Sequence, residues 1–373
     1  MRIALVRQRY NPHGGAERFI ERVLGAFPGG GATFSVFARR WTGARPGVEI
    51  VRCDPFYLGR VWRDAGFERA VCRALAARRF DLVQSHERVA CCDIFRAGDG
   101  VHAQWLDNRR RALGPLGRLG IACNPAHRYA LAAERRLFAS PRLRAVICNS
   151  RMVRDEIRSR FGVAEDKLHV IYNGVDLEAF HPRLRESLGA RARAELGIPP
   201  GAMTWVFVGS GFERKGVSRL VRAFREGAAA GAHLIVVGSD RRESRARAEA
   251  RDLGERVHFL GGRDDVRPWY GAADAFVLPT LYDPFPNAAL EAMACGLPVV
   301  TTHQCGAAEL VRPGENGWLC DALDAASLAS FMGALDPERA RAMGARARAT
   351  AEAHGLDATA ARLLALYRAL APG

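Results

Sequence analysis

Short apolar runs alternate with segments of helical periodicity along most of the chain. Residues 2–6 (RIALV) form the first such run, and residues 16–27 (AERFIERVLGAF) repeat their apolar side chains at the spacing of one helix face. The same order returns from residue 203 onward, where a strand-like run ends in Gly209 and a helical pattern follows. Strands that are apolar throughout and separated by helices are typical of parallel sheets covered on both faces. The pattern therefore predicts an α/β protein.

The chain of 373 residues is long enough for two domains of this kind. We place the first at residues 1–180 and the second at residues 181–355, because the segment between Asn173 and Met203 carries prolines and few strand signals. The amphipathic C-terminal segment, residues 356–373, is expected to pack back on the first domain. The predicted fold is two doubly wound, Rossmann-like domains that face each other across a cleft.

The charge balance points to an anionic partner. The chain carries 55 basic and 40 acidic side chains, a net charge of +15, and only Lys167 and Lys215 among the basic residues are lysine. Three partners fit such a charge: nucleic acid, an anionic membrane surface or a phosphorylated substrate. The alternative is that arginine is simply abundant in this composition.

The cysteines and the N-terminus indicate a reducing compartment. Nine cysteines without a C-x-x-C motif predict buried thiols, not a disulfide framework or a zinc site. The apolar part of MRIALVRQRYNP is too short for a signal peptide, and no run approaches the roughly 18 apolar residues of a membrane span. We therefore expect the protein in the cytoplasm.

Candidate chemistry gathers where the predicted strands end, which is where open α/β sheets bind ligands. Arg214 and Lys215 follow Gly209 at a predicted helix start, where two cations are unfavourable unless an anion is bound. They therefore predict a phosphate site, with a solvated surface pair as the alternative. The same rule brings the following residues toward one cleft: Gly14, Gly15, Asp99, His102 and Asp283.

The segment DPFPNAALEAMACGLPVV predicts a second binding element. It places Asp283 on a loop and Glu291 inside the helix that follows, with Asn287 as the expected N-cap. The free backbone N–H groups of such a helix start bind anions or sugar hydroxyls, and a pair of carboxylates can accept hydrogen bonds from a vicinal diol. The alternative is a capped helix with one exposed glutamate.

At this segment the chain resembles the family 4 glycosyltransferases, which have the GT-B fold and transfer a sugar from a nucleotide-sugar with retention at the anomeric carbon. NPHGGAER, YNGVDLEAF, GSGFERKGVSRLVRAF and GAAELVRPGENGWL match further family segments, so the resemblance covers nearly the whole chain. Asp283 stands where the family has glutamate, which shortens its reach by about 1.5 Å. Pro286 stands where the family often has glycine, which removes one backbone donor. Both departures bear on the contacts with the donor sugar.

The resemblance implies roles for individual residues. Arg214 and Lys215 stabilise the leaving diphosphate in place of a metal ion, so neither a metal nor a cofactor is expected. Glu291 holds the ribose hydroxyls, Arg263 lies near the base, and no residue acts as a nucleophile. The implied catalytic residues are Asp99, His102, Arg214, Lys215 and Asp283. The implied donor-binding residues are Gly14, Gly15, Gly209, Arg214, Lys215, Arg263, Asp283, Phe285, Asn287, Ala288 and Glu291. The implied acceptor-side residues are His86, Glu87 and Asp99.

The implied function is transfer of a hexose-type sugar, with a UDP-sugar as the expected donor, to a cell-envelope glycan or glycolipid such as lipopolysaccharide core. The arginine-rich segment 105–144 predicts contact with an anionic membrane at the inner face of the cytoplasmic membrane, with a pair of solvated helices as the alternative. Other functions compatible with the sequence are a GT-B-like epimerase and a non-catalytic sugar-nucleotide binder. A nucleic-acid binder fits the charge, but the chain has no recognisable nucleic-acid-reading module.

Overall fold

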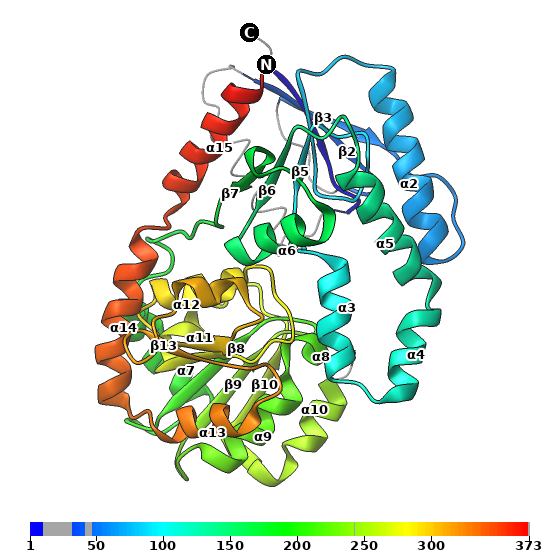
Figure 1. Ribbon diagram of the computed structural model, residues 1–373. Coiled ribbons are helices and arrows are strands. Elements are labelled where there is room, and N and C mark those ends of the chain that lie inside the picture. Colours follow the sequence, from blue (N-terminus) through cyan, green and yellow to red (C-terminus); the bar gives the residue numbers. More distant parts are fainter. Residues whose placement is uncertain (10–31, 42–46, 242, 372–373) are drawn as a thin grey trace. The chain divides into compact units, whose positions relative to one another are not determined.

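The computed structural model describes residues 1–9, 32–41, 47–241 and 243–371. These residues form two compact units (Figure 1). The first unit comprises Met1–Asn173 and Thr359–Gly373, and the second comprises Gly174–Ala358. None of the helices in the described ranges is both long and apolar enough to cross a membrane.

The first unit is built on a seven-stranded parallel sheet of order β3-β2-β1-β4-β5-β6-β7. The first strand of the chain, β1, lies inside the sheet, where it pairs in parallel with β2 on one side and with β4 on the other. The strands are β1 (Arg2–Val6), β2 (Thr33–Ala38), β3 (Val48–Arg52), β4 (Leu82–Ser85), β5 (Ile94–Arg96), β6 (Ala145–Cys148) and β7 (Leu168–Val170). The helices are α2 (Gly59–Ala76), α3 (His102–Arg111), α4 (Pro115–Cys123), α5 (Pro125–Phe138), α6 (Arg151–Phe161) and the C-terminal α15 (Leu356–Leu370).

Apolar side chains cover this sheet on both faces. One buried cluster includes side chains of α2, α5 and α6, such as Phe67, Leu137 and Ile157. The other includes Leu363 and Tyr367 of α15, so the C-terminal helix closes the opposite face (Figure 1). The C-terminal helix thus contributes to the core of the first unit.

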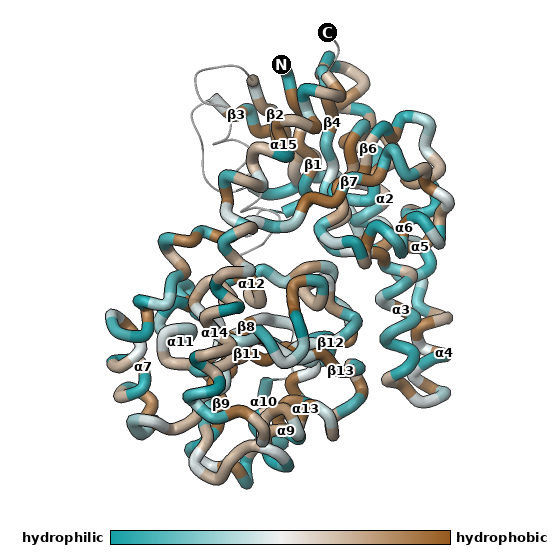
Figure 2. The backbone as a smooth tube through the Cα atoms, turned by 60° about the vertical axis from the view of Figure 1, so that its left-hand side comes forward, coloured by the Kyte–Doolittle hydropathy of each residue, from teal (hydrophilic) through white to brown (hydrophobic). Residues whose placement is uncertain are grey.

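The second unit contains a six-stranded parallel sheet of order β10-β9-β8-β11-β12-β13. Its inner strands are almost wholly buried and apolar, whereas helices such as α10 are rich in charge, and Figure 2 shows this contrast in hydropathy. The strands are β8 (Thr204–Val208), β9 (His233–Val237), β10 (Val257–Gly261), β11 (Ala275–Leu278), β12 (Val299–Thr302) and β13 (Gly317–Cys320). The main helices are α7 (Ala190–Glu195), α8 (Phe212–Lys215), α9 (Val217–Gly227), α10 (Glu243–Glu249), α11 (Arg267–Ala272), α12 (Asn287–Ala294), α13 (Ala325–Gly333) and α14 (Pro337–Glu352).

Both sheets have the strand order of doubly wound folds, in which the chain starts at the centre and then reverses direction. The prediction of two Rossmann-like α/β domains is therefore confirmed.

The cysteine prediction is wrong for three of the nine residues. Cys72 of α2 forms a disulfide with Cys91, which follows β4, and Cys123 at the end of α4 is exposed. The partners of the disulfide are 19 positions apart and meet only because α2 packs beside the loop after β4. A search for closely spaced cysteine motifs does not detect such a pair.

We predict that alkylation of the unfolded protein without reductant labels seven cysteines, and that reduction raises this number to nine. Reduction should also lower the free energy of unfolding in urea by about 3 kcal/mol, because the bond closes a short loop of the unfolded chain. Intact-mass spectrometry and urea titration measure the two effects. A Cys123→Ser variant is the matched control, and nine labels before reduction would disprove the pairing.

Candidate functional site

The two cations predicted to bind phosphate lie at the carboxyl edge of the second sheet. Arg214 and Lys215 form the last two positions of α8, which follows β8, and Gly216 then separates α8 from α9. Lys215 is only 8% exposed. The alternative of a solvated surface pair is therefore excluded for Lys215.

Asp283 joins both cations. Its Oδ2 atom lies 3.0 Å from Arg214 Nη1 and 3.2 Å from Lys215 Nζ. Burial alone would raise the pKa of this carboxyl, but the charges of Lys215 and Arg214 and their hydrogen bonds outweigh burial and hold the pKa below its ordinary value. Asp283 is therefore an ionised counter-charge to the two cations.

Backbone contacts fix the acid against the cations. The Leu281 N–H and the Thr280 hydroxyl both donate to the Arg214 carbonyl, at 2.8 and 3.2 Å. Arg214 Nη1 in turn donates to the Tyr282 carbonyl at 2.8 Å. The three residues before Asp283 in the loop after β11 thus all bond to Arg214 of α8.

Glycine backbone surrounds the Lys215 side chain. A Cβ atom at Gly209 would lie 2.8 Å from both Cδ and Nζ of Lys215, and the φ angle of 152° is one that glycine favours. At Gly238, a Cβ atom would lie 2.2 Å from the Gly209 carbonyl oxygen. A side chain at residue 209 would therefore obstruct the path of the lysine toward Asp283, and one at residue 238 would clash with the Gly209 backbone.

Glu291 is buried inside α12 and is held by a tyrosine. It is 5% exposed, and the Tyr270 hydroxyl lies 3.1 Å from its Oε2 atom and 3.1 Å from the Ala288 carbonyl oxygen. The alternative of an exposed glutamate is therefore excluded. The N-cap prediction is wrong, because Pro286 occupies the N-cap and Asn287 is the first helical residue.

The remaining residues that were predicted to bind the nucleotide-sugar differ in how far they are buried. Phe285 is buried in the loop before α12, and Ala288 is half-buried in its first turn. Arg263 is exposed after β10, with its guanidinium carbon 5.9 Å from the centre of the Trp269 ring. Gly14 and Gly15 lie outside the described residues.

In the first unit, one arginine joins two of the predicted acceptor-side acids. Arg7, directly after β1, lies 3.3 Å from Glu87 Oε1 and 3.8 Å from Asp99 Oδ2 through the same Nη1 atom. The Gln8 N–H also donates to Glu87 Oε1 at 3.0 Å. Burial and the nearby Asp99 charge raise the pKa of Glu87 despite the opposing effect of Arg7. His86, the neighbour of Glu87, is buried at the end of β4.

His102 lies in a different cluster from Asp99. It begins α3, and its Nε2 atom is 3.1 Å from His127 Nδ1. The buried Glu134 accepts hydrogen bonds from the His102 and Ala103 N–H groups and from Arg88 Nε, so this carboxylate caps α3. Burial, then the charge of Arg88, lowers the pKa of His102 to about 3, which keeps this imidazole neutral near pH 7.

Sequence reasoning missed Arg7, Tyr270 and Glu134. Tyr270 stands in an apolar stretch where it reads as a core residue, and the other two are ordinary surface types in sequence. Of the three, only Arg7 could have been found from the sequence, because it directly follows a predicted strand and open α/β sheets bind ligands at the carboxyl ends of their strands. Within the described ranges, no three histidine, cysteine or acidic side chains gather as a metal site requires.

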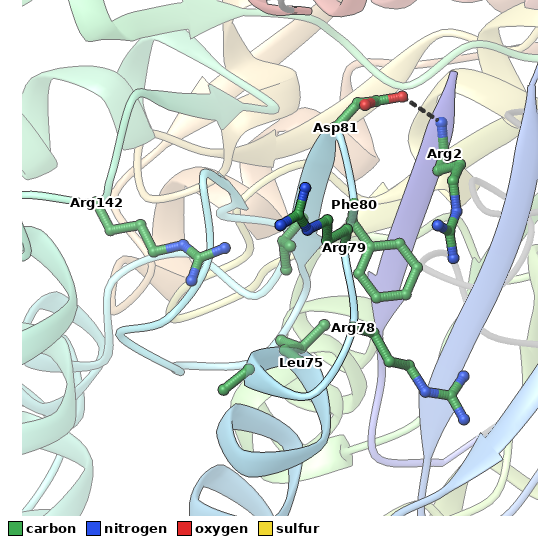
Figure 3. A pocket seen from close by; sticks show the side chains of 9 residues that line it. Arg2, Leu75, Arg78, Arg79, Phe80, Asp81 and Arg142 are labelled. Carbon is green, nitrogen blue, oxygen red and sulfur yellow. Dashed lines mark hydrogen bonds between the residues drawn. The ribbon is translucent and has the colours of Figure 1, made fainter.

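A pocket of about 560 Å³ opens at the other edge of the first sheet (Figure 3). Its lining includes Arg2 at the start of β1, Asp81 just before β4, and Arg142. The Arg2 N–H donates to Asp81 and Arg142 already pairs with Asp93. Because His86 and Glu87 follow the opposite end of β4, this pocket is separate from the candidate site.

Several solved structures share this fold. The chain matches the crystal structure of WaaG, a glycosyltransferase involved in lipopolysaccharide biosynthesis, over 98% of its own length and 99% of that chain, with a TM-score of 0.84 and 23% identity. It matches Anabaena HepE in complex with UDP-glucose over 99% and 100% of the two chains, with a TM-score of 0.73 and 21% identity. Likeness at these identities establishes the shared fold, and the GT-B prediction is confirmed.

Sequence comparisons identify the family. Residues 13–179 match the model described as Glycosyltransferase Family 4, and residues 202–335 match the model described as Glycosyl transferases group 1. A probable transglycosylase from Burkholderia thailandensis is 29% identical over 303 residues, which are 80% of this chain and 77% of that protein. The chain belongs to glycosyltransferase family 4.

We predict that a Gly209→Ala substitution displaces the Lys215 side chain and exposes its amine, because the added Cβ atom occupies the path of that side chain. The chain has only two lysines, so amine acetylation followed by peptide mass spectrometry reports Lys215 directly, with Lys167 as the internal reference. Lys215 should react more slowly than Lys167 in the parent protein and several-fold faster in the variant.

Gly211→Ala is the matched control for this substitution. A Cβ atom there meets nothing within 4 Å, although its φ angle of 84° imposes comparable backbone strain. Equal Lys215 labelling in the parent protein and the Gly209→Ala variant would show that the glycine does not set the lysine position.

Proposed function

We propose that this glycosyltransferase is a retaining, metal-independent hexosyltransferase that uses a UDP-sugar and modifies a cell-envelope glycan or glycolipid, such as lipopolysaccharide core. The observation that carries the proposal is the pair formed by the half-buried Arg214 and the buried Lys215 around Asp283. The likeness to HepE with UDP-glucose supports the donor, and the likeness to WaaG supports the acceptor class.

The cation pair suits the chemistry of the leaving group. Cleavage of the sugar–phosphate bond develops negative charge on the diphosphate, and cations fixed in a buried position stabilise that charge without reorganising. Lys215 supplies a compact ammonium and Arg214 a planar fork, which together can meet different phosphate oxygens. In this proposal the diphosphate joins Asp283 as a partner of the two cations.

In this proposal the main role of Asp283 is to neutralise the two cations, and contact with the donor sugar is secondary. The buried Lys215 ammonium beside the half-buried Arg214 guanidinium would be costly without a counter-charge, and the short aspartate reaches both through a single oxygen. We assign Asp283 chiefly to holding Arg214 and Lys215 in place. We assign Glu291, which Tyr270 orients, to accept hydrogen bonds from the ribose hydroxyls.

On the acceptor side, Asp99 is the candidate proton acceptor. Its side chain is 67% exposed, whereas Glu87 is more enclosed and receives hydrogen bonds from Arg7 and the Gln8 N–H. We assign Glu87 and Arg7 to orienting the acceptor and Asp99 to receiving or positioning the proton of its hydroxyl. His102 serves as a neutral hydrogen-bonding group in this proposal.

Calorimetric titration with UDP, GDP and ADP in EDTA tests the donor site. We expect UDP to bind the parent protein, and Lys215→Ala to weaken binding by about 1.5 kcal/mol or more, because a charge-assisted hydrogen bond is lost. Lys167→Ala removes the same charge from the first unit, where Lys167 bonds to the Leu143 carbonyl, and should bind UDP normally.

Binding that requires a divalent ion would remove metal independence from the proposal, and equal affinity in the two lysine variants would remove the phosphate role of Lys215. Incubation with a UDP-sugar alone separates a transferase from an epimerase, since an epimerase changes the sugar without an acceptor.

Membrane contact is the second part of the proposal. Helix α4 exposes Leu116 and Leu119 on one face, at 85% and 60% of their surfaces, beside the basic last turn of α3. Exposed leucines next to arginines suit the interface of an anionic bilayer. This arrangement would bring the enzyme to a lipid-linked acceptor.

Liposomes containing anionic lipid should sediment the parent protein at physiological salt. Replacing both Leu116 and Leu119 by serine should reduce the bound fraction several-fold, because apolar area can no longer enter the bilayer. Leu58→Ser is the control, since Leu58 is 68% exposed but precedes α2. Failure of the parent protein to sediment would refute the membrane contact and leave the donor site untouched.

A further inference from the structure

A buried chain of hydrogen bonds connects the C-terminal helix to the end of β4. The Tyr367 hydroxyl of α15 donates to Gln84 Oε1 at 2.6 Å, across a sequence separation of 283. The Gln84 Nε2 atom lies 3.1 Å from His86 Nε2. Tyr367 and Gln84 have no exposed surface and His86 is 6% exposed, so water does not compete for these bonds.

The chemistry of the three side chains fixes which group donates and which accepts in each of these hydrogen bonds. A phenol has one proton to donate, the amide oxygen only accepts, and the amide NH₂ only donates. Because Tyr367 holds the Gln84 oxygen, the Gln84 NH₂ faces His86. His86 Nε2 must then accept, which places the imidazole proton on Nδ1.

Two further effects keep this arrangement in place. Burial, and then the charges of Arg96 and Arg7, lower the pKa of His86 well below its ordinary value, so the ring is neutral. Burial raises the pKa of Tyr367, so its hydroxyl keeps the proton that it donates. Neither Tyr367 nor His86 therefore changes its protonation state near neutral pH.

We propose that Tyr367 is a positioning residue that acts through Gln84 to hold His86 as the Nδ1–H tautomer, which makes α15 a working part of the acceptor-side site. The functional half of this inference rests on the proposed function, in which His86 and Glu87 lie on the acceptor side. The Nδ1–H group is then the only donor that the His86 ring can offer.

The tyrosine hydroxyl decides between two orientations of the glutamine amide. Without it, the Gln84 oxygen would be a buried acceptor with no donor, which is costly. Rotation of the amide would turn that oxygen toward His86, which would then donate from Nε2. A Tyr367→Phe substitution is therefore expected to switch the tautomer while keeping the ring and its packing.

The experiment measures the His86 tautomer in the full chain by long-range ¹H–¹⁵N correlation after ¹⁵N-histidine labelling, with His86→Asn to assign the signal. We expect Nδ1–H in the parent protein and a loss of that form in Tyr367→Phe. Tyr129→Phe is the control, because its hydroxyl bonds to Glu68 on α2 and it should leave His86 unchanged. Gln84→Glu offers only acceptor oxygens and provides a second route to the same switch.

The possible outcomes distinguish the positioning role of Tyr367 from the acceptor-side role of His86. An Nε2–H tautomer in the parent protein, or an unchanged tautomer in both Tyr367→Phe and Gln84→Glu, overturns the proposal. A switched tautomer with a roughly tenfold lower kcat/KM for the acceptor and an unchanged KM for the donor supports it fully. A switched tautomer with unchanged transfer supports the positioning role and overturns the acceptor-side role of His86.

Discussion

The second unit depends on one interaction, in which the Asp283 carboxylate lies against Arg214 and Lys215. Buried cations without a counter-charge are strongly destabilising, so the loop after β11 has to deliver an acid to the end of α8. Hydrogen bonds from Leu281 and Thr280 to the Arg214 carbonyl set that distance through the backbone. The salt bridge and the hydrogen bonds therefore join the loop after β11 to α8 and hold Asp283 against both cations.

The first unit also has ion pairs at the ends of its strands, but their distances are longer. Arg7 forms ion pairs with Glu87 and Asp99. His86 contacts Gln84, which in turn accepts a hydrogen bond from Tyr367. In both units these groups follow the carboxyl ends of strands, where parallel sheets leave room for ligands. The arginines at the amino edge of the first sheet are instead exposed, and part of them is already paired (Figure 3). The two candidate sites thus differ from the amino-edge arginines in that their charged groups are held in networks at the carboxyl ends of strands.

The sequence predicts the fold well because its signals are local. Apolar strands ending in glycine and helices of regular period are visible within short windows, and the cations and Asp283 follow from motifs. Contacts between distant segments leave no such signal. Tyr367 reads as one more apolar position of an amphipathic helix, and Cys72 and Cys91 read as unrelated thiols. His102 was expected near the donor by resemblance, but the structure shows it with His127 and Glu134, and its proposed role stays a prediction.

Space explains why a chain so rich in arginine has a lysine at position 215. The Lys215 stem passes so close to the bare Gly209 backbone that a single Cβ atom would touch its Cδ and Nζ. A guanidinium is wider and planar, and it needs several acceptors at once. Arg214 has that room, because a third of its side chain is exposed and its Nη1 atom reaches both the Tyr282 carbonyl and Asp283. The narrow, buried position selects an ammonium and the open one a guanidinium, so the pair consists of two cations of different shape, as the proposed binding of a diphosphate requires.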